Sequence, residues 1–225
     1  MGQAAGSRFD FDAVAGSYDG WYESAEGVFY DRLEKDAVQQ VLPSAKAGRR
    51  LLEVGCGTGH WSRFFVERGF HVVGLDPSPG MVRVAVEKRI GDAQFLVADG
   101  DDLPFERGRF DVAAAVTVLE FARDPVSVLA EMARCTRPGG VLVVGVLNRR
   151  SPLGLRRSLR PSAIFAEARM PTVGTLRRWL AGYGTAEVRS AAFAWPRFAS
   201  PVLERIGRHA RLPWGDFIVG CCRLD

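Results

Sequence analysis

The chain has 225 residues, of which 47% are hydrophobic and 25% charged, and its formal net charge is +4. These values are typical of a soluble globular protein and exclude a disordered or fibrous chain. No apolar run approaches the roughly 20 residues of a membrane-spanning helix. The first residues lack the features of a secretory signal, so we expect one domain over residues 1–225, located in the cytoplasm.

The four cysteines do not have the spacing of metal ligands, so we expect no metal site. Cys56 and Cys135 stand alone, and Cys221 and Cys222 are adjacent in an apolar run. Free cysteines are often small buried residues, which fits a reducing compartment.

Residues 1–46 predict an amphipathic helical lead-in, with Phe9, Val14 and Tyr18 on one side. From residue 49 to residue 148, short apolar runs alternate with amphipathic stretches, which predicts parallel strands with crossover helices. The predicted strands are RLLEVG, HVVGLD, AQFLVAD, FDVAAAVTVL and VLVVGVL. The predicted helices are HWSRFFVERG, SPGMVRVAVEKRIG and DPVSVLAEMARCTRPGG, the last one ended by its Pro-Gly-Gly.

The alternation breaks after Asn148. Residues 149–173 contain prolines and an irregular pattern, which indicates a small inserted cap with short helices. An amphipathic helix follows in TVGTLRRWLAGYG, and TAEVRSAAFAW and WGDFIVGCCRL predict two more strands separated by the helical PVLERIGRHA. Because these strands lack a long crossover, we expect an antiparallel end to a doubly wound α/β sheet of seven strands.

Three glycines, Gly55, Gly57 and Gly59, alternate directly after the first predicted strand. Open parallel sheets bind ligands at this edge, and glycine permits positive φ and a close approach of the ligand to the backbone. A dinucleotide site prefers the spacing G-x-G-x-x-G. Here the third position is His60 or Ser62, so the loop favours another ligand class.

The G-x-G-x-G loop with the preceding Glu53 resembles motif I of the class I S-adenosylmethionine-dependent methyltransferases. VVGLDPSPGM, FLVADGDDLPF, FDVAAAVTVLEF and RPGGVLVVGVLN resemble the motifs that follow in that family. The resemblance implies a Rossmann-like sheet and S-adenosyl-L-methionine as cofactor. It also implies that Asp76 takes the ribose hydroxyls, that Asp99 takes the adenine amino group, and that the backbone of Gly100 and Asp101 faces the ring.

The lead-in FDAVAGSYDGWYES resembles the small-molecule branch related to the ubiquinone and menaquinone biosynthesis methyltransferases. There the tyrosine lies over the methionine part of the cofactor, which nominates Tyr18. The alternative is that these aromatic residues only attach the lead-in to the domain. In all, the resemblance assigns to the cofactor site Tyr18, Glu53, Gly55, Cys56, Gly57, Gly59, Asp76, Pro77, Met81, Asp99, Gly100, Asp101, Val116 and Thr117.

The resemblance implies methyl transfer to a small molecule. We expect the cap to enclose a small, partly apolar acceptor, with Leu153, Leu155, Ile164 and Phe165 as its lining. Glu120 is the candidate general base, and the alternative is a carboxylate at the rim held by a nearby arginine. Aromatic faces for the sulfonium would come from Tyr18, Trp21 or Trp61.

The segment from Arg149 to Arg211 is rich in arginine, which is typical of a solvated surface or of an anion-binding patch. One alternative function is therefore RNA methylation, with phosphates held by Arg156, Arg157, Arg160, Arg177 and Arg178. Base-methylating enzymes usually carry an Asn-Pro-Pro-Tyr-like element where this chain has residues 117–120 as TVLE, so we expect no nucleic-acid partner. A protein that binds the cofactor without catalysis is the other alternative, and peripheral membrane contact would suit a lipid-like acceptor.

Overall fold

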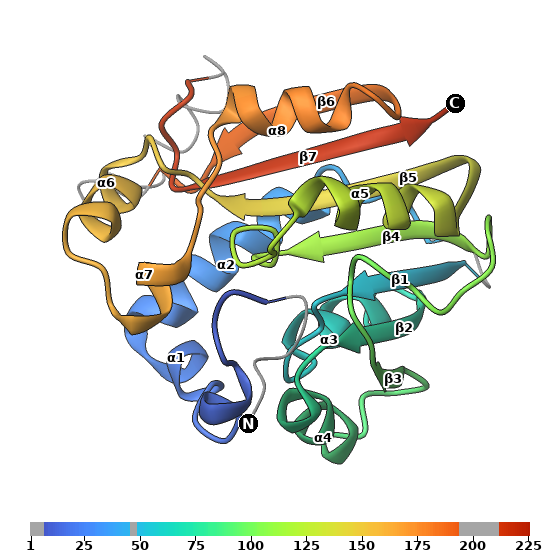
Figure 1. Cartoon of the computed structure of the whole chain (residues 1–225), viewed down its shortest axis with the longest axis horizontal. Helices are drawn as coiled ribbons and strands as arrows, with labels where there is room; N and C mark the ends of the chain where they lie inside the picture. The colour runs from blue at the N-terminus through green and yellow to red at the C-terminus, as the bar shows by residue number, and fades with distance from the viewer. Residues whose placement is uncertain (1–6, 46–48, 194–211) are drawn as a thin grey trace.

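The computed structural model describes residues 7–45, 49–193 and 212–225. Within them, a seven-stranded sheet forms the centre of the molecule and helices cover both of its faces (Figure 1). The strands are β1 (Arg50–Val54), β2 (His71–Asp76), β3 (Gln94–Val97), β4 (Phe110–Val116), β5 (Thr136–Leu147), β6 (Gly184–Ala191) and β7 (Phe217–Leu224). The helices are η1 (Asp12–Val14), α1 (Gly20–Glu23), α2 (Ala25–Gln39), α3 (His60–Val66), α4 (Pro79–Glu87), α5 (Pro125–Cys135), α6 (Pro152–Leu159), α7 (Ala163–Glu167) and α8 (Val173–Leu180).

The strand order is β3-β2-β1-β4-β5-β7-β6. Strands β1 to β5 pair in parallel, and β7 pairs antiparallel with both β5 and β6. The predicted fold class, a mostly parallel doubly wound sheet with an antiparallel end, is confirmed. The carboxyl ends of β1, β2, β3 and β4 therefore lie along one edge of the sheet, next to the lead-in and the cap (Figure 1).

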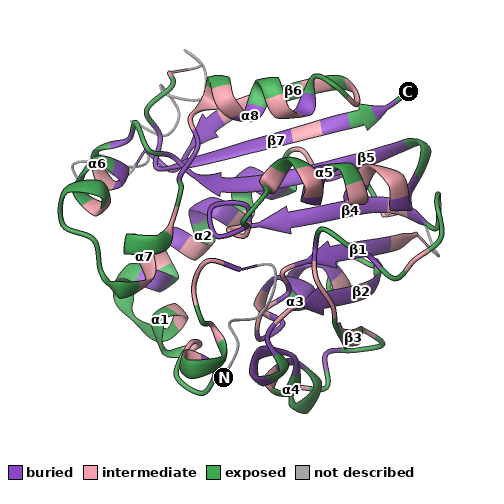
Figure 2. Cartoon of the chain, viewed as in Figure 1, coloured by how far each residue is buried: buried purple, intermediate pink, exposed green. Residues whose placement is uncertain are grey.

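Two apolar layers hold the helices to the sheet. On one face, α2 and α3 contribute Val38 and Phe65, which pack in a cluster with Val143 of β5. On the other face, α5 and α8 contribute Leu129 and Leu176 to a second cluster. The central strand β4 is buried on both faces, as Figure 2 shows. This explains why its sequence is a continuous apolar run and not an alternating one.

Two element boundaries differ from the prediction. Helix α5 ends at Cys135 and β5 begins at Thr136, so the Pro-Gly-Gly that was predicted to end the helix forms the entry of the strand. A Cβ at Gly140 would lie 2.8 Å from the carbonyl oxygen of Asp111, where the pairing with β4 shifts register. Strand β4 ends at Val116 because Thr117 has a positive φ of 54° and turns the chain.

The lead-in is helical as predicted, in η1, α1 and α2, and α6 and α7 lie within residues 149–173. The predicted helix over residues 201–210 and the end of the predicted strand over residues 185–195 lie outside the described residues. None of the helices in the described part of the chain has the length and apolar character needed to cross a membrane.

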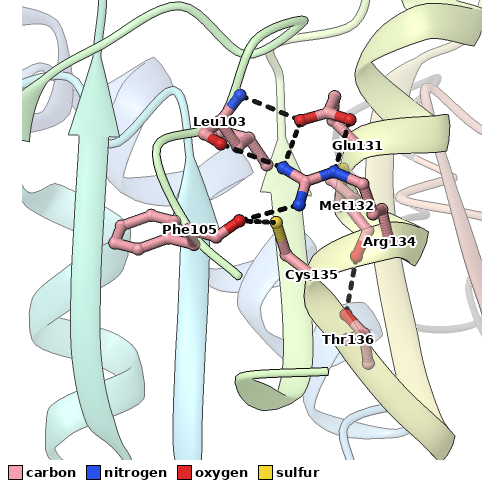
Figure 3. A network of polar contacts seen from close by, with 7 residues as sticks. All are labelled: Leu103, Phe105, Glu131, Met132, Arg134, Cys135 and Thr136. Carbon is pink, nitrogen blue, oxygen red and sulfur yellow. Dashed lines mark hydrogen bonds and ion pairs between the residues drawn. The ribbon is translucent and has the colours of Figure 1, made fainter. Parts of the chain in front are cut away.

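A polar network fixes the loop that follows β3. The Arg134 guanidinium of α5 donates to the carbonyl oxygens of Leu103 and Phe105 at 2.9 and 2.7 Å. Glu131, one turn earlier, accepts from Arg134 and from the backbone N–H of Leu103. Figure 3 shows the guanidinium between the carboxylate and the two carbonyl groups. The network anchors the loop that begins at Asp99.

Replacing Arg134 with Met should lower the free energy of unfolding by about 1 to 3 kcal/mol, because two carbonyls and one carboxylate lose their donor. Urea unfolding measures the change. Arg107→Met, which alters an exposed side chain near the same network, is the matched control and should stay within about 0.5 kcal/mol of the parent protein. Equal losses in both variants would contradict the role of the hydrogen bonds.

Candidate functional site

The glycine loop leaves β1 and enters α3. Its three glycines all have positive φ, of 71° at Gly55, 51° at Gly57 and 81° at Gly59, which is the left-handed region that favours glycine. A Cβ at Gly55 would meet Val118 at 2.4 Å, and one at Gly59 would meet Ile90 at 2.6 Å. A Cβ at Gly57 would meet nothing within 4 Å. Protein side chains thus press on the outer two glycines, and Gly57 stays open.

A cleft lies over this loop at the carboxyl ends of the parallel strands, and we call it the glycine-loop cleft. Its lining includes these residues that the sequence assigned to a cofactor: Tyr18, Gly55, Cys56, Gly57, Asp76, Pro77, Met81, Asp99, Gly100, Val116 and Thr117. The other lining residues are Ser7, Phe11, Tyr22, Val54, Thr58, His60, Trp61, Leu75, Val118, Phe121, Ala122 and Val128. The assigned residues are therefore brought together from five separate segments of the chain.

Three assigned residues do not line the cleft. Glu53 is buried beneath the loop, where it accepts a hydrogen bond of 2.5 Å from the Ser62 hydroxyl of α3, and burial raises its pKa to about 8. Gly59 is the N-cap of α3, and Asp101 is exposed in a turn. Glu53 and Gly59 therefore support the glycine loop, Glu53 through its bond to α3 and Gly59 as the N-cap of that helix.

Asp76 ends β2 at the cleft and is 8% exposed. Its Oδ2 accepts from the Gly57 N–H at 3.0 Å and its Oδ1 from the Ser78 N–H at 2.9 Å. Burial raises the pKa of this carboxyl to about 6, against the effect of the two N–H donors. A carboxylate has about four lone-pair sites. Each oxygen of Asp76 therefore retains the capacity to accept from a ligand hydroxyl.

Asp99 lies at the cleft just beyond β3 and is half-buried. Burial raises its pKa, and the charge of the nearby Asp101 adds to the increase. Asp76 is the last residue of β2, and Asp99 comes two residues after the end of β3, which pairs in parallel with β2. The cleft thus carries two carboxyl groups on adjacent strands.

Two carboxylates fasten the lead-in over the cleft. Asp12 accepts from the Ser78 hydroxyl at 2.8 Å and from the Gly80 N–H at 2.5 Å, at the start of α4. Asp19 accepts from the Thr58 hydroxyl at 2.7 Å and forms an ion pair of 2.6 Å with Lys88. Sequence reasoning missed both, although acids flank the aromatic residues of this segment. Tyr18 lies between these two attached residues in the chain, and it lines the cleft.

Trp61 and His60, at the start of α3, complete the wall behind the loop. The ring of His60 stacks on Tyr22 with centroids 3.6 Å apart, and its Nε2 lies 2.7 Å from Asp31 Oδ1. The indole N–H of Trp61 is buried without a hydrogen-bond partner among the described residues. His60, which the sequence left undecided, thus faces the cleft and positions Tyr22.

A second space of about 270 Å³ adjoins the cleft, and we call it the aromatic cavity. It is lined by Phe11, Val14, Ser17, Tyr18, Trp21, Tyr22, Glu34, Thr117, Phe121, Leu147, Arg157, Ile164 and Phe165. Phe11, Tyr18, Tyr22, Thr117 and Phe121 line both spaces. A cavity of roughly 150 Å³ holds benzene. The aromatic cavity therefore has room for a substituted ring or a small bicyclic compound.

The cap contributes to the aromatic cavity in part as expected. Ile164 and Phe165 line it as predicted, whereas Leu153 is not among the lining residues and packs against the core. The prediction for Leu155 is wrong, since its side chain is 58% exposed. Residues four apart share one face of a helix. Helix α6 therefore turns Leu153 and Arg157 inward and Leu155 outward.

Glu120 is fully buried and lies outside the lining of both spaces. Its Oε1 accepts from the Leu147 N–H at 2.6 Å, and its Oε2 has no partner among the described residues. Burial raises its pKa to about 7. The alternative of a carboxylate at the rim is wrong, because the chain folds back over Glu120 at the end of β5.

Glu34 is an acidic residue of the aromatic cavity that sequence reasoning missed. It lies on α2 among the buried Tyr30, Leu33, Ala37 and Val38, and it is 6% exposed. A single acid on the apolar face of a helix was the available signal.

The chain matches the family model described as a methyltransferase domain over residues 52–144. It is 33% identical over 202 residues to the demethylmenaquinone methyltransferase of Renibacterium salmoninarum, a match that covers 79% of this chain and 83% of that protein. It is also 34% identical to the malonyl-[acyl-carrier protein] O-methyltransferase of Serratia marcescens, over 61% of this chain and 51% of that one. The match to a protein of Methanocaldococcus jannaschii covers 64% of that protein's length. The chain thus spans about half to two thirds of the length of the Serratia marcescens and Methanocaldococcus jannaschii relatives.

Among solved structures, the chain is similar to an S-adenosylmethionine-dependent methyltransferase of Thermotoga maritima. The TM-score is 0.73 and the identity 27%, and the similarity covers 95% of this chain and 97% of that one. The glycine loop, the order of the strands and these relatives agree. The chain therefore belongs to the class I S-adenosylmethionine-dependent methyltransferases, in the branch related to demethylmenaquinone methyltransferase, and its cofactor is S-adenosylmethionine.

Proposed function

We propose that this protein is an enzyme that transfers the methyl group of S-adenosylmethionine to a small, partly apolar acceptor held in the aromatic cavity. The observation that carries the proposal is the shared wall. Tyr18, Tyr22 and Thr117 line both the glycine-loop cleft and the aromatic cavity. A compound in the cavity would thus adjoin a cofactor in the cleft.

The residues of the cleft fit the cofactor. Asp76 has lone pairs left for the two ribose hydroxyls, and Gly57 is open on its Cβ side. We assign Asp99 to the adenine amino group and Tyr18 to the methionine end. The unpartnered indole N–H of Trp61 suits an acceptor such as the cofactor's carboxylate. When bound, the cofactor supplies a methyl group already activated by a positively charged sulfur.

The protein's part is then to orient the acceptor and exclude water. Orientation of two reactants contributes roughly 7 to 11 kcal/mol to such a reaction. Aromatic faces from Phe11, Tyr18 and Trp61 surround the cleft, and such faces attract a cation. The lead-in, fastened by Asp12 and Asp19, covers the site.

The distribution of arginines favours a small acceptor over RNA. Arg156 and Arg160 are exposed on or next to α6, and Arg177 and Arg178 are exposed on α8. Arg157 lines the aromatic cavity instead. Arg157, which was expected to hold phosphate together with its exposed neighbours, thus points to the proposed acceptor site.

Titration calorimetry should show binding of S-adenosylmethionine and S-adenosylhomocysteine, and none of NAD. Asp76→Ala should weaken S-adenosylhomocysteine binding by roughly five-fold to 150-fold, because paired hydrogen bonds worth about 1 to 3 kcal/mol are lost. Asp36→Ala, an exposed position on α2, is the control. Unchanged affinity in Asp76→Ala would contradict the placement of the ribose.

Methyl transfer itself is measured as S-adenosylhomocysteine release in a panel of small phenols, amines, carboxylic acids and a short RNA. We expect release with a small apolar acceptor and none with the RNA, because the aromatic cavity of about 270 Å³ admits a ring and not a folded nucleic acid. Tight cofactor binding without transfer to any compound would contradict the enzyme proposal and favour a protein that only binds the cofactor.

A further inference from the structure

Two ionisable side chains line the aromatic cavity, and the cofactor site uses neither. Glu34 comes from α2 and Arg157 from α6, and both line the cavity. The guanidinium of Arg157 lies over the Phe165 ring, 4.3 Å from its centroid. Glu34 is 6% exposed and lines the cavity, and no hydrogen bond to its carboxyl is found among the described residues. Its oxygens border the cavity and are not sealed in the interior as Glu120 Oε2 is, so a ligand in the cavity can donate to them.

Glu34 and Arg157 do not form an ion pair, since every nitrogen–oxygen distance between them is longer than 4.0 Å. Among the charged groups, each nevertheless has the largest effect on the pKa of the other. Because both line the cavity without touching, a polar group of a ligand can lie between them. A hydroxyl group both donates to a carboxylate and accepts from a guanidinium. An ammonium group has no lone pair and cannot accept from Arg157.

The surroundings of this pair are acidic and apolar. The ionisable groups that face Glu34 are Arg157 of α6, Asp31 on its own helix, Glu120 beyond β4, Asp216 before β7, and Tyr18 and Tyr22 of the lead-in. Arg157 is the positive member of this set. A second carboxylate, brought by an acidic acceptor, would add to the negative charge around Glu34.

Resting on the proposed function, we propose that the acceptor is a weakly acidic hydroxyl compound, a phenol or an enol, with a flat apolar body. In this assignment Glu34 removes the hydroxyl proton and Arg157 holds the resulting oxyanion. Phe121 and Phe165 pack against the body of the acceptor. Glu34 is thus the catalytic base of an oxygen-directed methyl transfer, in place of Glu120.

Proton transfer and methyl transfer each break one bond and form one. The O–H bond of the acceptor breaks, and its proton goes to a carboxylate oxygen of Glu34. The acceptor oxygen forms a bond to the methyl carbon while the carbon–sulfur bond breaks, and that electron pair stays on sulfur. The products are the methyl ether and S-adenosylhomocysteine, and the proton then leaves Glu34 for solvent.

Burial suits Glu34 to this task. It raises the pKa of the carboxyl to about 8, with a smaller opposing effect of the Arg157 charge. A general base works best when its pKa lies near the operating pH and near that of the group it deprotonates. Phenols and enols meet that condition far better than alcohols do.

The first test measures binding to the complete chain saturated with S-adenosylhomocysteine, by calorimetry with 2-naphthol, 2-naphthylmethylamine and 2-naphthoate. We expect 2-naphthol to bind about tenfold or more tightly than the other two, and Arg157→Met to remove about tenfold of its affinity, because a charge-assisted hydrogen bond is lost. Arg156→Met, an adjacent exposed arginine, is the matched control.

Tighter binding of the amine, or of the carboxylate, or of none of the three, would overturn the hydroxyl assignment. Failure to bind S-adenosylhomocysteine would instead overturn the proposed function, so the two failures are distinguishable. Equal effects of Arg156→Met and Arg157→Met would also overturn the assignment, because only Arg157 faces the cavity.

The second test follows methyl transfer to 2-naphthol against pH. In the parent protein, kcat/KM should rise with pH and level off above about 8, as Glu34 loses its proton. Glu34→Gln should lower kcat/KM by about a hundredfold or more near neutral pH, the usual contribution of a general base. Its residual rate should rise toward the pKa of 2-naphthol itself. Glu23→Gln, exposed on α1, is the control. An unchanged profile in Glu34→Gln would overturn the role of Glu34.

Unfolding by heat tests whether Glu34→Gln folds. The folded pKa of Glu34 is raised above its unfolded value, so burial of this group has no cost below about pH 4.5, costs more as the pH rises to about 8, and is constant above that. The melting temperature of Glu34→Gln should therefore rise relative to that of the parent protein as the pH increases from about 5 to about 8. A variant that loses stability across this range would overturn the placement of a buried, unpartnered carboxyl group.

Discussion

Two carboxylates hold the lead-in to the start of α4 and to the glycine loop, and residues of the lead-in line both binding spaces. Asp12 takes the free N–H of Gly80 at the start of α4, and Asp19 bonds to Thr58 in the glycine loop. The positive end of a helix favours an acid at this place. Tyr18 and Phe11 are carried into position by these bonds, and they wall both the cleft and the cavity.

Three buried glutamates near the site differ in what they do. Burial raises the pKa of Glu53, Glu120 and Glu34. Glu53 accepts from Ser62, and Oε1 of Glu120 accepts from the backbone N–H of Leu147, while Oε2 of Glu120 has no partner among the described residues. Both carboxyl groups lie outside the lining of the two binding spaces. Glu34 differs because it lines the aromatic cavity, and no hydrogen bond to it is found among the described residues, which is the arrangement expected of a group used in chemistry.

The strands and the residues that line the glycine-loop cleft could be predicted from the sequence because their signals are local. Buried parallel strands are apolar runs of four to eight residues, and the chain shows them between helical stretches. The alternating glycines and the acids Asp76 and Asp99 follow such runs directly. Since the carboxyl ends of parallel strands meet at one edge, their order along the chain was enough to place them together. The end of α5 was predicted less well, because a register shift beside β4 makes the Pro-Gly-Gly part of β5.

The sequence by itself determined the fold class, the glycine loop and the cofactor. Only the tertiary structure decided which side chains line the aromatic cavity. Glu34 and Arg157 are far apart in the chain, and nothing local distinguishes Arg157 from the exposed Arg156 beside it. The phase of α6, set by the packing of Leu153 against the core, turns one arginine inward and the other to solvent. Contacts between distant segments depend on such packing, and a pattern read along the chain does not contain it.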